Sequence, residues 1–184
     1  MKNKILKGGQ TLSSGFTLVE IIIAVGLFTV IMTLASGAYL IMISANRQAQ
    51  SVATGINNLS FALETMTRNI RTGTNYGCPT EGADCGNGGF SFSFRNEDNA
   101  LVTYDLSAST IQETKGGVSR MLTDSSVNIS SLVFYASGTA GRPLGDYRQP
   151  RVTIVVSGTV SSGPGRPPES FTIETGATMR GSDI

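Results

Sequence analysis

Few residues of this 184-residue chain have the chemistry to act on a substrate. The sequence contains no histidine, the commonest general base and transition-metal ligand near neutral pH. No glycine-rich loop joins a strand to a helix in the way that cradles phosphate, and no motif places a base beside a serine or threonine. Lys115 is the only lysine after residue 72, which leaves little material for a lysine–serine pair. We therefore expect that the protein is not an enzyme and needs no cofactor.

Cys78 and Cys85 are the only cysteines, and they bracket the segment PTEGAD. Outside the cytoplasm, two cysteines this close in sequence are expected to pair as a disulfide. Such a short closed loop adds under roughly 3 kcal/mol of stability and mainly pins the loop. A zinc site would need two further ligands, which without histidine would have to be carboxylates. The disulfide is the better interpretation.

Two acidic turns offer oxygen ligands of the kind that calcium prefers. One is NEDN (Asn96–Asn99), and the other holds Glu81 and Asp84. Acidic and amide side chains are also the ordinary composition of hairpin loops. Calcium is therefore an alternative here, and no metal site is predicted.

Glu20 is the only charged side chain in a 28-residue apolar stretch from Phe16 to Ile43. About 20 apolar residues suffice to span a bilayer as a helix. A carboxylate at membrane depth costs about 2.5–3.5 kcal/mol and usually has a partner. The stretch contains no lysine, arginine or histidine, so a partner for Glu20 must come from elsewhere.

The flanks of the apolar stretch predict its orientation. Residues 1–15 carry three lysines and no acid, so they should remain in the cytoplasm. Residues 73–184 carry eight Lys/Arg against eleven Asp/Glu, which predicts an extracytoplasmic head without the basic surface of a nucleic-acid-binding protein. A secretory signal peptide ending in LASGA (34–38) is the alternative, but its apolar region would be only about 7–15 residues long.

A single helix from about Phe16 to Thr72 must position these residues, since no proline occurs before Pro79. In residues 44–72 the pattern becomes amphipathic, with one apolar stripe at helical spacing. Its members are Val52, Ile56, Leu59, Leu63, Met66 and Ile70. The stripe covers fewer than three heptads, so packing on the chain's own head is favoured over a coiled coil. Gly73 is the expected C-cap, and Glu64 and Arg68 have the spacing of a helical ion pair.

The sequence of the head predicts short strands joined by turns. The expected strands are 89–94 and 100–106, a weaker pair at 109–114 and 118–122, and then 127–137, 151–160 and 170–180. Gly/Pro-rich loops separate the last three. Because no helix intervenes, the strands should form an antiparallel sheet, which makes the fold class α+β.

The N-terminal residues resemble a known family. The segment KILKGGQTLSSGFTLVEIIIAVGLFTVIMTLA is similar to the class III leader and N-terminal helix of type IV pilins and type II secretion pseudopilins. The matching elements are a short basic leader that ends in Gly15, then Phe16, Thr17, Leu18 and Glu20, and then an unbroken apolar helix. The resemblance covers about the first 30 residues of the chain, which include the leader.

This resemblance implies processing and assembly. It implies that prepilin peptidase removes residues 1–15 by cutting after Gly15 and N-methylates Phe16. It also implies that Glu20 pairs with the N-terminal amine of a neighbouring subunit in a filament, because a charge pair in a dry core costs less than either charge alone. Residues 16–43 would first hold the protein in the cytoplasmic membrane, with the head (73–184) outside.

The expected function is therefore a structural subunit, preferably a minor subunit, of a type IV pilus, with other pilins as partners. The ending QPRVTIVVSG…ESFTIETGATMR is similar to the last strands of larger minor pilins and J-type pseudopilins. A minor pseudopilin of a type II secretion system is the alternative. A membrane-anchored or secreted binding protein is the competing interpretation from another class.

Overall fold

The computed structural model describes residues 15–78, 80–140 and 148–180 of the chain. Its elements are α1 (Leu18–Thr72), β1 (Thr74–Gly77), β2 (Ser91–Arg95), β3 (Leu101–Ser107), β4 (Thr110–Lys115), β5 (Val118–Met121), β6 (Val127–Ser137), β7 (Arg151–Val160) and β8 (Glu169–Thr178). The chain divides into two compact units, Met1–Ala45 and Asn46–Ile184, and the residues of α1 are shared between them. The α+β fold class is confirmed: one long helix is followed by antiparallel strands.

The first unit consists, in its described part, of the apolar half of α1. Its large hydrophobic side chains from Phe16 to Met42 are exposed. Two hydroxyl groups of this half bond to the helix backbone: Thr29 donates to the Gly26 carbonyl at 2.8 Å, and Thr33 donates to the Thr29 carbonyl at 2.8 Å. The surface that this half offers is therefore almost purely apolar. It is long enough to cross a membrane.

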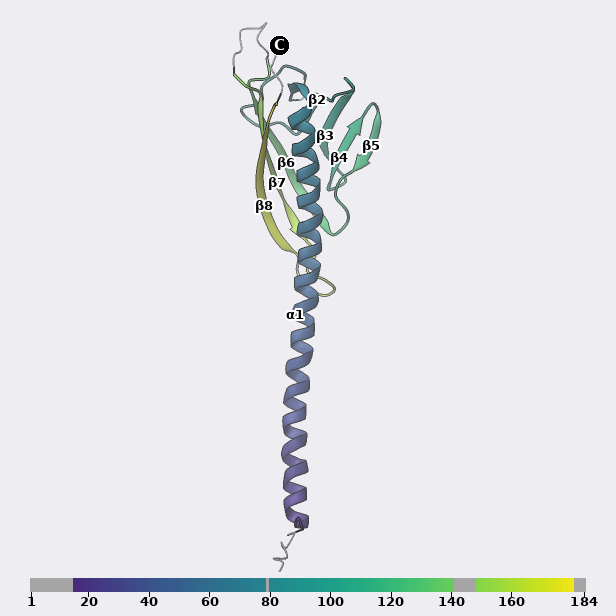
Figure 1. The fold of residues 1–184 in the computed structure, drawn as a ribbon, viewed down its shortest axis with the longest axis vertical. Coiled ribbons are helices and arrows are strands. Elements are labelled where there is room, and N and C mark those ends of the chain that lie inside the picture. The colour runs from purple at the N-terminus through teal and green to yellow at the C-terminus, as the bar shows by residue number, and fades with distance from the viewer. Residues whose placement is uncertain (1–14, 79, 141–147, 181–184) are drawn as a thin grey trace, which may run out of the picture. The chain divides into compact units, whose positions relative to one another are not determined.

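The second unit contains two antiparallel sheets (Figure 1). Strands β1 to β5 form a five-stranded meander in sequence order, and β6, β7 and β8 form a three-stranded sheet. The sequence predicted the β2–β3 and β4–β5 hairpins and the three later strands, but as parts of one sheet. Two sheets form because β5 and β6 do not pair, and β6 instead lies against β2, β3 and β4. Strand β1 was not predicted.

The core of the second unit lies between the sheets and the distal half of α1. Leu59, Leu63, Met66 and Ile70 are buried together with aromatic residues of β2, β3 and β6. The prediction that this stripe packs on the chain's own head is confirmed. Phe92 is at the centre of the aromatic group, with ring centroids 5.3 Å from Tyr76 and 5.6 Å from Phe134.

Two small residues replace part of the predicted stripe. Gly55 and Ala62 are buried, whereas Ile56 is 36% exposed and Val52 is only half-buried. At Gly55 the helix lies so close to β7 that a Cβ atom would meet Val160 Cγ1 at 2.3 Å. The helix therefore uses its smallest side chains where the strands come nearest, and the apolar periodicity alone does not reveal them.

The helix ends as predicted, but Gly73 serves a different purpose from the one expected. Gly73 does not adopt the left-handed conformation of a C-cap glycine. Its lack of a side chain is required because a Cβ atom there would lie 2.2 Å from Phe94 Cδ2. The carbonyls of the last turn find other donors: the Tyr76 hydroxyl donates to the Ile70 carbonyl, and the Arg180 amide donates to the Arg71 carbonyl at 3.0 Å.

Candidate functional site

The N-terminal candidate site consists of Gly15, Phe16 and the first turn of α1. Gly15 and Phe16 precede the helix and are exposed, Phe16 to 78%. Thr17 caps the helix: its Oγ1 accepts a hydrogen bond from the Glu20 amide at 3.3 Å, and its carbonyl accepts from the Ile21 amide at 3.2 Å. The bond between Gly15 and Phe16 therefore lies in an exposed segment immediately before a long helix.

Glu20 lies in the first turn of α1, three residues after its cap. The order Thr17-x-x-Glu20 is that of a capping box. A carboxylate in the first turn is also stabilised by the positive N-terminal end of the helix dipole. The sequence reasoning missed this local benefit, although the Thr-x-x-Glu spacing was a signal for it. Within residues 15–78, 80–140 and 148–180, Glu20 has no ion-pair partner.

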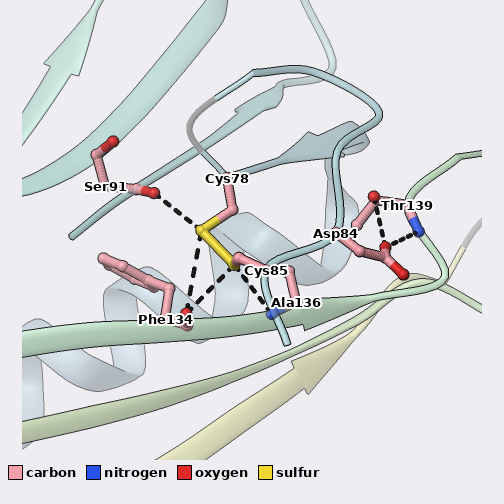
Figure 2. The surroundings of a disulfide bond; sticks show 7 residues. All are labelled: Cys78, Asp84, Cys85, Ser91, Phe134, Ala136 and Thr139. Atoms are coloured by element: carbon pink, nitrogen blue, oxygen red, sulfur yellow. Dashed lines mark hydrogen bonds between the residues drawn. A yellow bond between two sulfur atoms is a disulfide. The ribbon is translucent and has the colours of Figure 1, made fainter. Parts of the chain in front are cut away.

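The second candidate site is the predicted disulfide, which is present between Cys78 and Cys85 with their Cα atoms 5.7 Å apart. Figure 2 shows it against β6. Each sulfur has a carbonyl oxygen 3.3 Å away, that of Ser91 for Cys78 and that of Phe134 for Cys85. The Ala136 amide donates to Cys85 Sγ at 3.3 Å, and the Cys85 amide donates to the Ala136 carbonyl at 3.0 Å. The disulfide loop, of which residues 78 and 80–85 are described, is therefore held at the outer edge of β6 by Cys85.

Gly89 continues this contact between the two sheets. Its amide and carbonyl exchange two hydrogen bonds of 2.8 Å with Phe134 of β6. A Cβ atom on Gly89 would lie 2.1 Å from Cys78 Sγ, so only glycine fits beside the disulfide. The disulfide loop and Gly89 together form what we call the clasp, which joins the five-stranded sheet to the three-stranded one.

Asp84 anchors the disulfide loop at its other side. Its Oδ1 accepts hydrogen bonds from the Thr139 amide at 3.0 Å and the Thr139 hydroxyl at 2.7 Å (Figure 2). Partial burial acts to raise the pKa of Asp84, but these two bonds, a bond from the Gly138 amide and the charge of Arg148 together outweigh it. The pKa of Asp84 is therefore held below its usual value.

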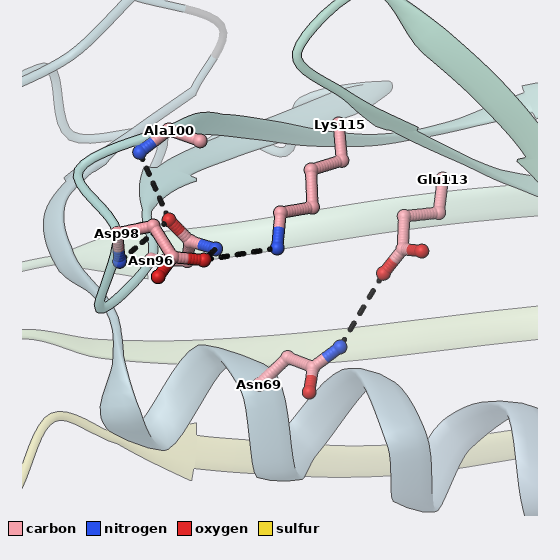
Figure 3. A network of polar contacts seen from close by, with 6 residues as sticks. All are labelled: Asn69, Asn96, Asp98, Ala100, Glu113 and Lys115. Atoms are coloured by element: carbon pink, nitrogen blue, oxygen red, sulfur yellow. Dashed lines mark hydrogen bonds and ion pairs between the residues drawn. The ribbon is translucent and has the colours of Figure 1, made fainter.

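A polar network lies between the end of α1 and the five-stranded sheet (Figure 3). The Glu113 side chain is 9% exposed, and its Oε1 accepts from the Tyr104 hydroxyl at 3.0 Å and from Asn69 Nδ2 at 3.3 Å. Arg120 pairs with its Oε2 at 2.6 Å. Burial, aided by the Glu113 charge, raises the pKa of Tyr104. The Glu113 carboxylate is thus fully engaged, and the network fastens the helix to the sheet.

An open groove of about 330 Å³ lies beside this network. Its lining contains both cations, such as Arg68 and Lys115, and carboxylates, such as Glu97 and Asp98. Lys115 and Asp98 neutralise each other at 3.3 Å. The mixed charges favour no one class of ligand.

Apart from Glu97, the residues named for calcium are engaged in the protein's own contacts. Glu81 pairs with Arg95 at 2.9 Å, and Asp84 is bound by Thr139. In the NEDN turn, Asn96 Oδ1 accepts from the amides of Asp98 and Ala100 (Figure 3). Among the described residues, no three carboxylate, cysteine or histidine side chains gather as a metal site would require. The geometry is that of an ordinary hairpin turn.

The predicted site residues form two sites rather than one. Gly15, Phe16 and Glu20 belong to the first unit, and Cys78 and Cys85 belong to the second. Comparison of the chain with protein-family models, curated proteins and solved structures finds no match. The function must therefore be inferred from the residues themselves.

Proposed function

We propose that the chain is a structural subunit of a type IV pilus that is processed after Gly15 and assembled through its N-terminal helix. The observation that carries the proposal is the exposed, apolar half of α1, which begins two residues after Phe16 and has one carboxylate between Leu18 and Ile43, that of Glu20. The resemblance of residues 4–35 to prepilins supports the cleavage after Gly15 and the assembly through the N-terminal helix.

The proposed processing would create the partner that Glu20 lacks. Hydrolysis of the Gly15–Phe16 amide by prepilin peptidase releases the leader and leaves an α-amino group on Phe16, which the same enzyme methylates. That amine stays cationic after one methylation. A neighbouring subunit's amine would pair with Glu20 in the apolar filament core, where two opposite charges together cost less than each alone.

The exposed apolar surface from Phe16 to Met42 supports both stages of this proposal. Before assembly, lipid would cover it as a single membrane span with the head outside the cytoplasm. In the filament, the same surface would pack against the helices of other subunits. The clasp and the network around Glu113 would keep the head folded outside the cell, where no reducing pool maintains free thiols.

The proposal is tested first at the cleavage site. Gly15→Val should leave an uncut precursor in cells that contain prepilin peptidase, whereas Gly9→Val, a change of the same kind in the leader, should be cut. Mass spectrometry of the purified protein measures both the loss of residues 1–15 and the methyl group on Phe16. Normal removal of the leader from Gly15→Val would contradict the proposal and would favour the membrane-anchored binding protein.

The second test concerns Glu20. Glu20→Ala should still be cut and methylated but should enter filaments on the order of 100-fold less well. This estimate comes from the cost of about 2.5–3.5 kcal/mol for one unpaired charge and the 1.4 kcal/mol that corresponds to each tenfold change. Thr17→Ala, which removes the cap and keeps the carboxylate, is the control. If Glu20→Ala assembled as well as that control, Glu20 would have no pairing role.

A minor pseudopilin of a type II secretion system remains the second candidate, since it would use the same N-terminal features. Deletion of the gene separates the two: loss of surface pili with normal secretion favours the pilus, and loss of secretion with normal pili favours the pseudopilus.

A further inference from the structure

The strand edges of the second unit differ in what covers them. The outer edge of β6 is occupied by the other sheet, because Ile129 donates to the Ser109 carbonyl at 2.9 Å and Phe134 exchanges bonds with Gly89. Strand β1 has only four residues and an irregular register. Among the described residues, β8 and β5 each pair on one side only.

Among the described residues, strand β8 has the longest edge without a strand partner. All ten of its residues pair with β7, and its other edge has no strand partner among residues 15–78, 80–140 and 148–180. Its solvent-facing residues include Ser170, Thr172 and Glu174, while Phe171 and Ile173 turn inward against the core. Edge strands in soluble proteins are commonly blunted by proline, by charged side chains or by a bulge. Strand β8 has no proline and no bulge, and its charged side chains are two glutamates, so it is able to accept a strand of opposite charge.

The charges on β8 select the partner. Glu169 and Glu174 are exposed and take part in no ion pair within the described residues. If two copies of β8 paired with each other, carboxylates would face a second acidic edge, which is unfavourable. A strand with positive charge and no acid fits better.

Strand β5 has that character. All four of its residues are exposed, and its one charged side chain is Arg120, which pairs with Glu113 at 2.6 Å and still has 64% of its side chain exposed. Figure 1 shows β5 and β8 on opposite sides of the strand-rich unit. A contact between β5 of one copy and β8 of the next is therefore head to tail, and such contacts repeat into open-ended arrays rather than closed dimers.

We propose that β8 accepts β5 of a second copy of this chain by strand addition. Main-chain hydrogen bonds between the two strands provide the attraction, and the opposite charges of Arg120 and the β8 glutamates favour β5 over a second β8 edge as the partner strand. Four residues give a weak contact in free solution. It becomes effective when the helices hold neighbouring heads together, because tethering raises the local concentration to the millimolar range.

The test uses cysteine pairs in the full-length chain, in membranes and in detergent, with a short bis-maleimide as cross-linker. A tagged Ser119→Cys chain mixed with an untagged Thr172→Cys chain should give a cross-linked heterodimer. A chain with both substitutions should give a ladder of oligomers. Ser60→Cys, on the exposed face of α1, replaces Ser119→Cys in the matched control and should give at least tenfold less product with Thr172→Cys.

Each outcome decides between partners. Cross-linking of Thr172→Cys to itself at the level of the mixed pair would overturn the proposal in favour of paired β8 edges. Cross-linking only to a different protein would overturn the assignment to a second copy. Absence of the ladder in membranes, with the leader correctly removed, would refute the edge contact and leave the proposed function standing, since cleavage and filament entry are measured separately.

Discussion

Among the single residues, Asp84 allows the sharpest prediction of pH dependence. Hydrogen bonds from Thr139 and Gly138 hold its pKa below the usual value despite the opposing effect of partial burial. A carboxylate with a lowered folded-state pKa stabilises the fold above its unfolded pKa of about 3.9, and that stabilisation is lost as the pH falls through the folded pKa. Asp84→Asn should therefore lower the free energy of unfolding at pH 7. Because the side chain is exposed, the loss should be under about 1 kcal/mol.

The measurement is chemical denaturation of the two proteins at a series of pH values from 7 to 3. The difference between wild type and Asp84→Asn should be constant above about pH 5 and should shrink below about pH 4. Glu97→Gln removes the same charge from an exposed side chain that makes no hydrogen bond or ion pair in the described structure, and it controls for net charge. If the difference in the free energy of unfolding between wild type and Asp84→Asn grew as the pH fell, the lowered pKa of Asp84 in the folded state would be contradicted.

Residue-level predictions from sequence succeeded where neighbours in the chain decide the contact. Glu64 and Arg68 form the expected ion pair at 3.4 Å, and Cys78 and Cys85 form the expected disulfide. The sequence did not show why Gly89 must be a glycine, because Cys78 Sγ approaches it only after the two sheets have come together. Contacts of that kind depend on the tertiary arrangement and leave no local pattern.

Among the elements, helix α1 is most sensitive at Gly55. Helix propensity alone predicts that Gly55→Ala stabilises the protein by about 1 kcal/mol. However, the new Cβ atom would meet Val160 Cγ1 at 2.3 Å, and Val160 is a buried β-branched residue that has little freedom to move. Overpacking of this kind costs about 1–3 kcal/mol, so Gly55→Ala should be destabilising overall.

A double-mutant cycle isolates this clash. Val160→Ala creates space at the same point and should cost about 1–2 kcal/mol by itself. The double variant Gly55→Ala/Val160→Ala should then be more stable than the sum of the two single effects predicts, by 0.5 kcal/mol or more. Additive effects, measured by thermal or chemical unfolding, would show that the helix and β7 are not in close contact there.

The elements themselves could be predicted to different degrees. Strands β6 and β7 have the predicted bounds because both are long and rich in β-branched residues; β7 alternates along its whole length, and β6 does so except at the register shift between Ile129 and Ser131. Strand β1 was missed since it has four residues and includes Asn75 in a left-handed conformation, which ordinarily marks a turn. The division into two sheets could not be predicted, because alternation shows which face of a strand is buried and not which strand lies beside it.

For the whole molecule, the clasp is the feature that links distant parts of the second unit. It joins the β1–β2 connection to β6 through the Cys85–Ala136 hydrogen bonds, which span 51 residues of the chain, and the Gly89–Phe134 hydrogen bonds, which span 45. The sequence predicted that the disulfide would pin a loop. The structure shows that the pinned loop also holds the two sheets together.

The double variant Cys78→Ala/Cys85→Ala tests this role. Closing a loop of this size should stabilise the fold by roughly 2–3 kcal/mol. The free energy of unfolding of the variant should therefore be lower by that amount, and its denaturation midpoint should fall to a lower denaturant concentration. Hydrogen exchange should also quicken at the amides of Gly89 and Phe134, which the disulfide holds in place. A disulfide that only restrained its own loop would leave exchange at Phe134 unchanged relative to an amide at the centre of the same sheet, such as that of Val155 in β7.

Reduced wild-type protein is the control for the substituted side chains. It should match the double variant in stability and exchange, because both proteins lack the disulfide bond, although the reduced protein keeps the two sulfur atoms. Agreement of the two in unfolding and exchange would assign the effect to the covalent link, whereas fast exchange in the variant alone would assign it to the loss of sulfur packing against β6.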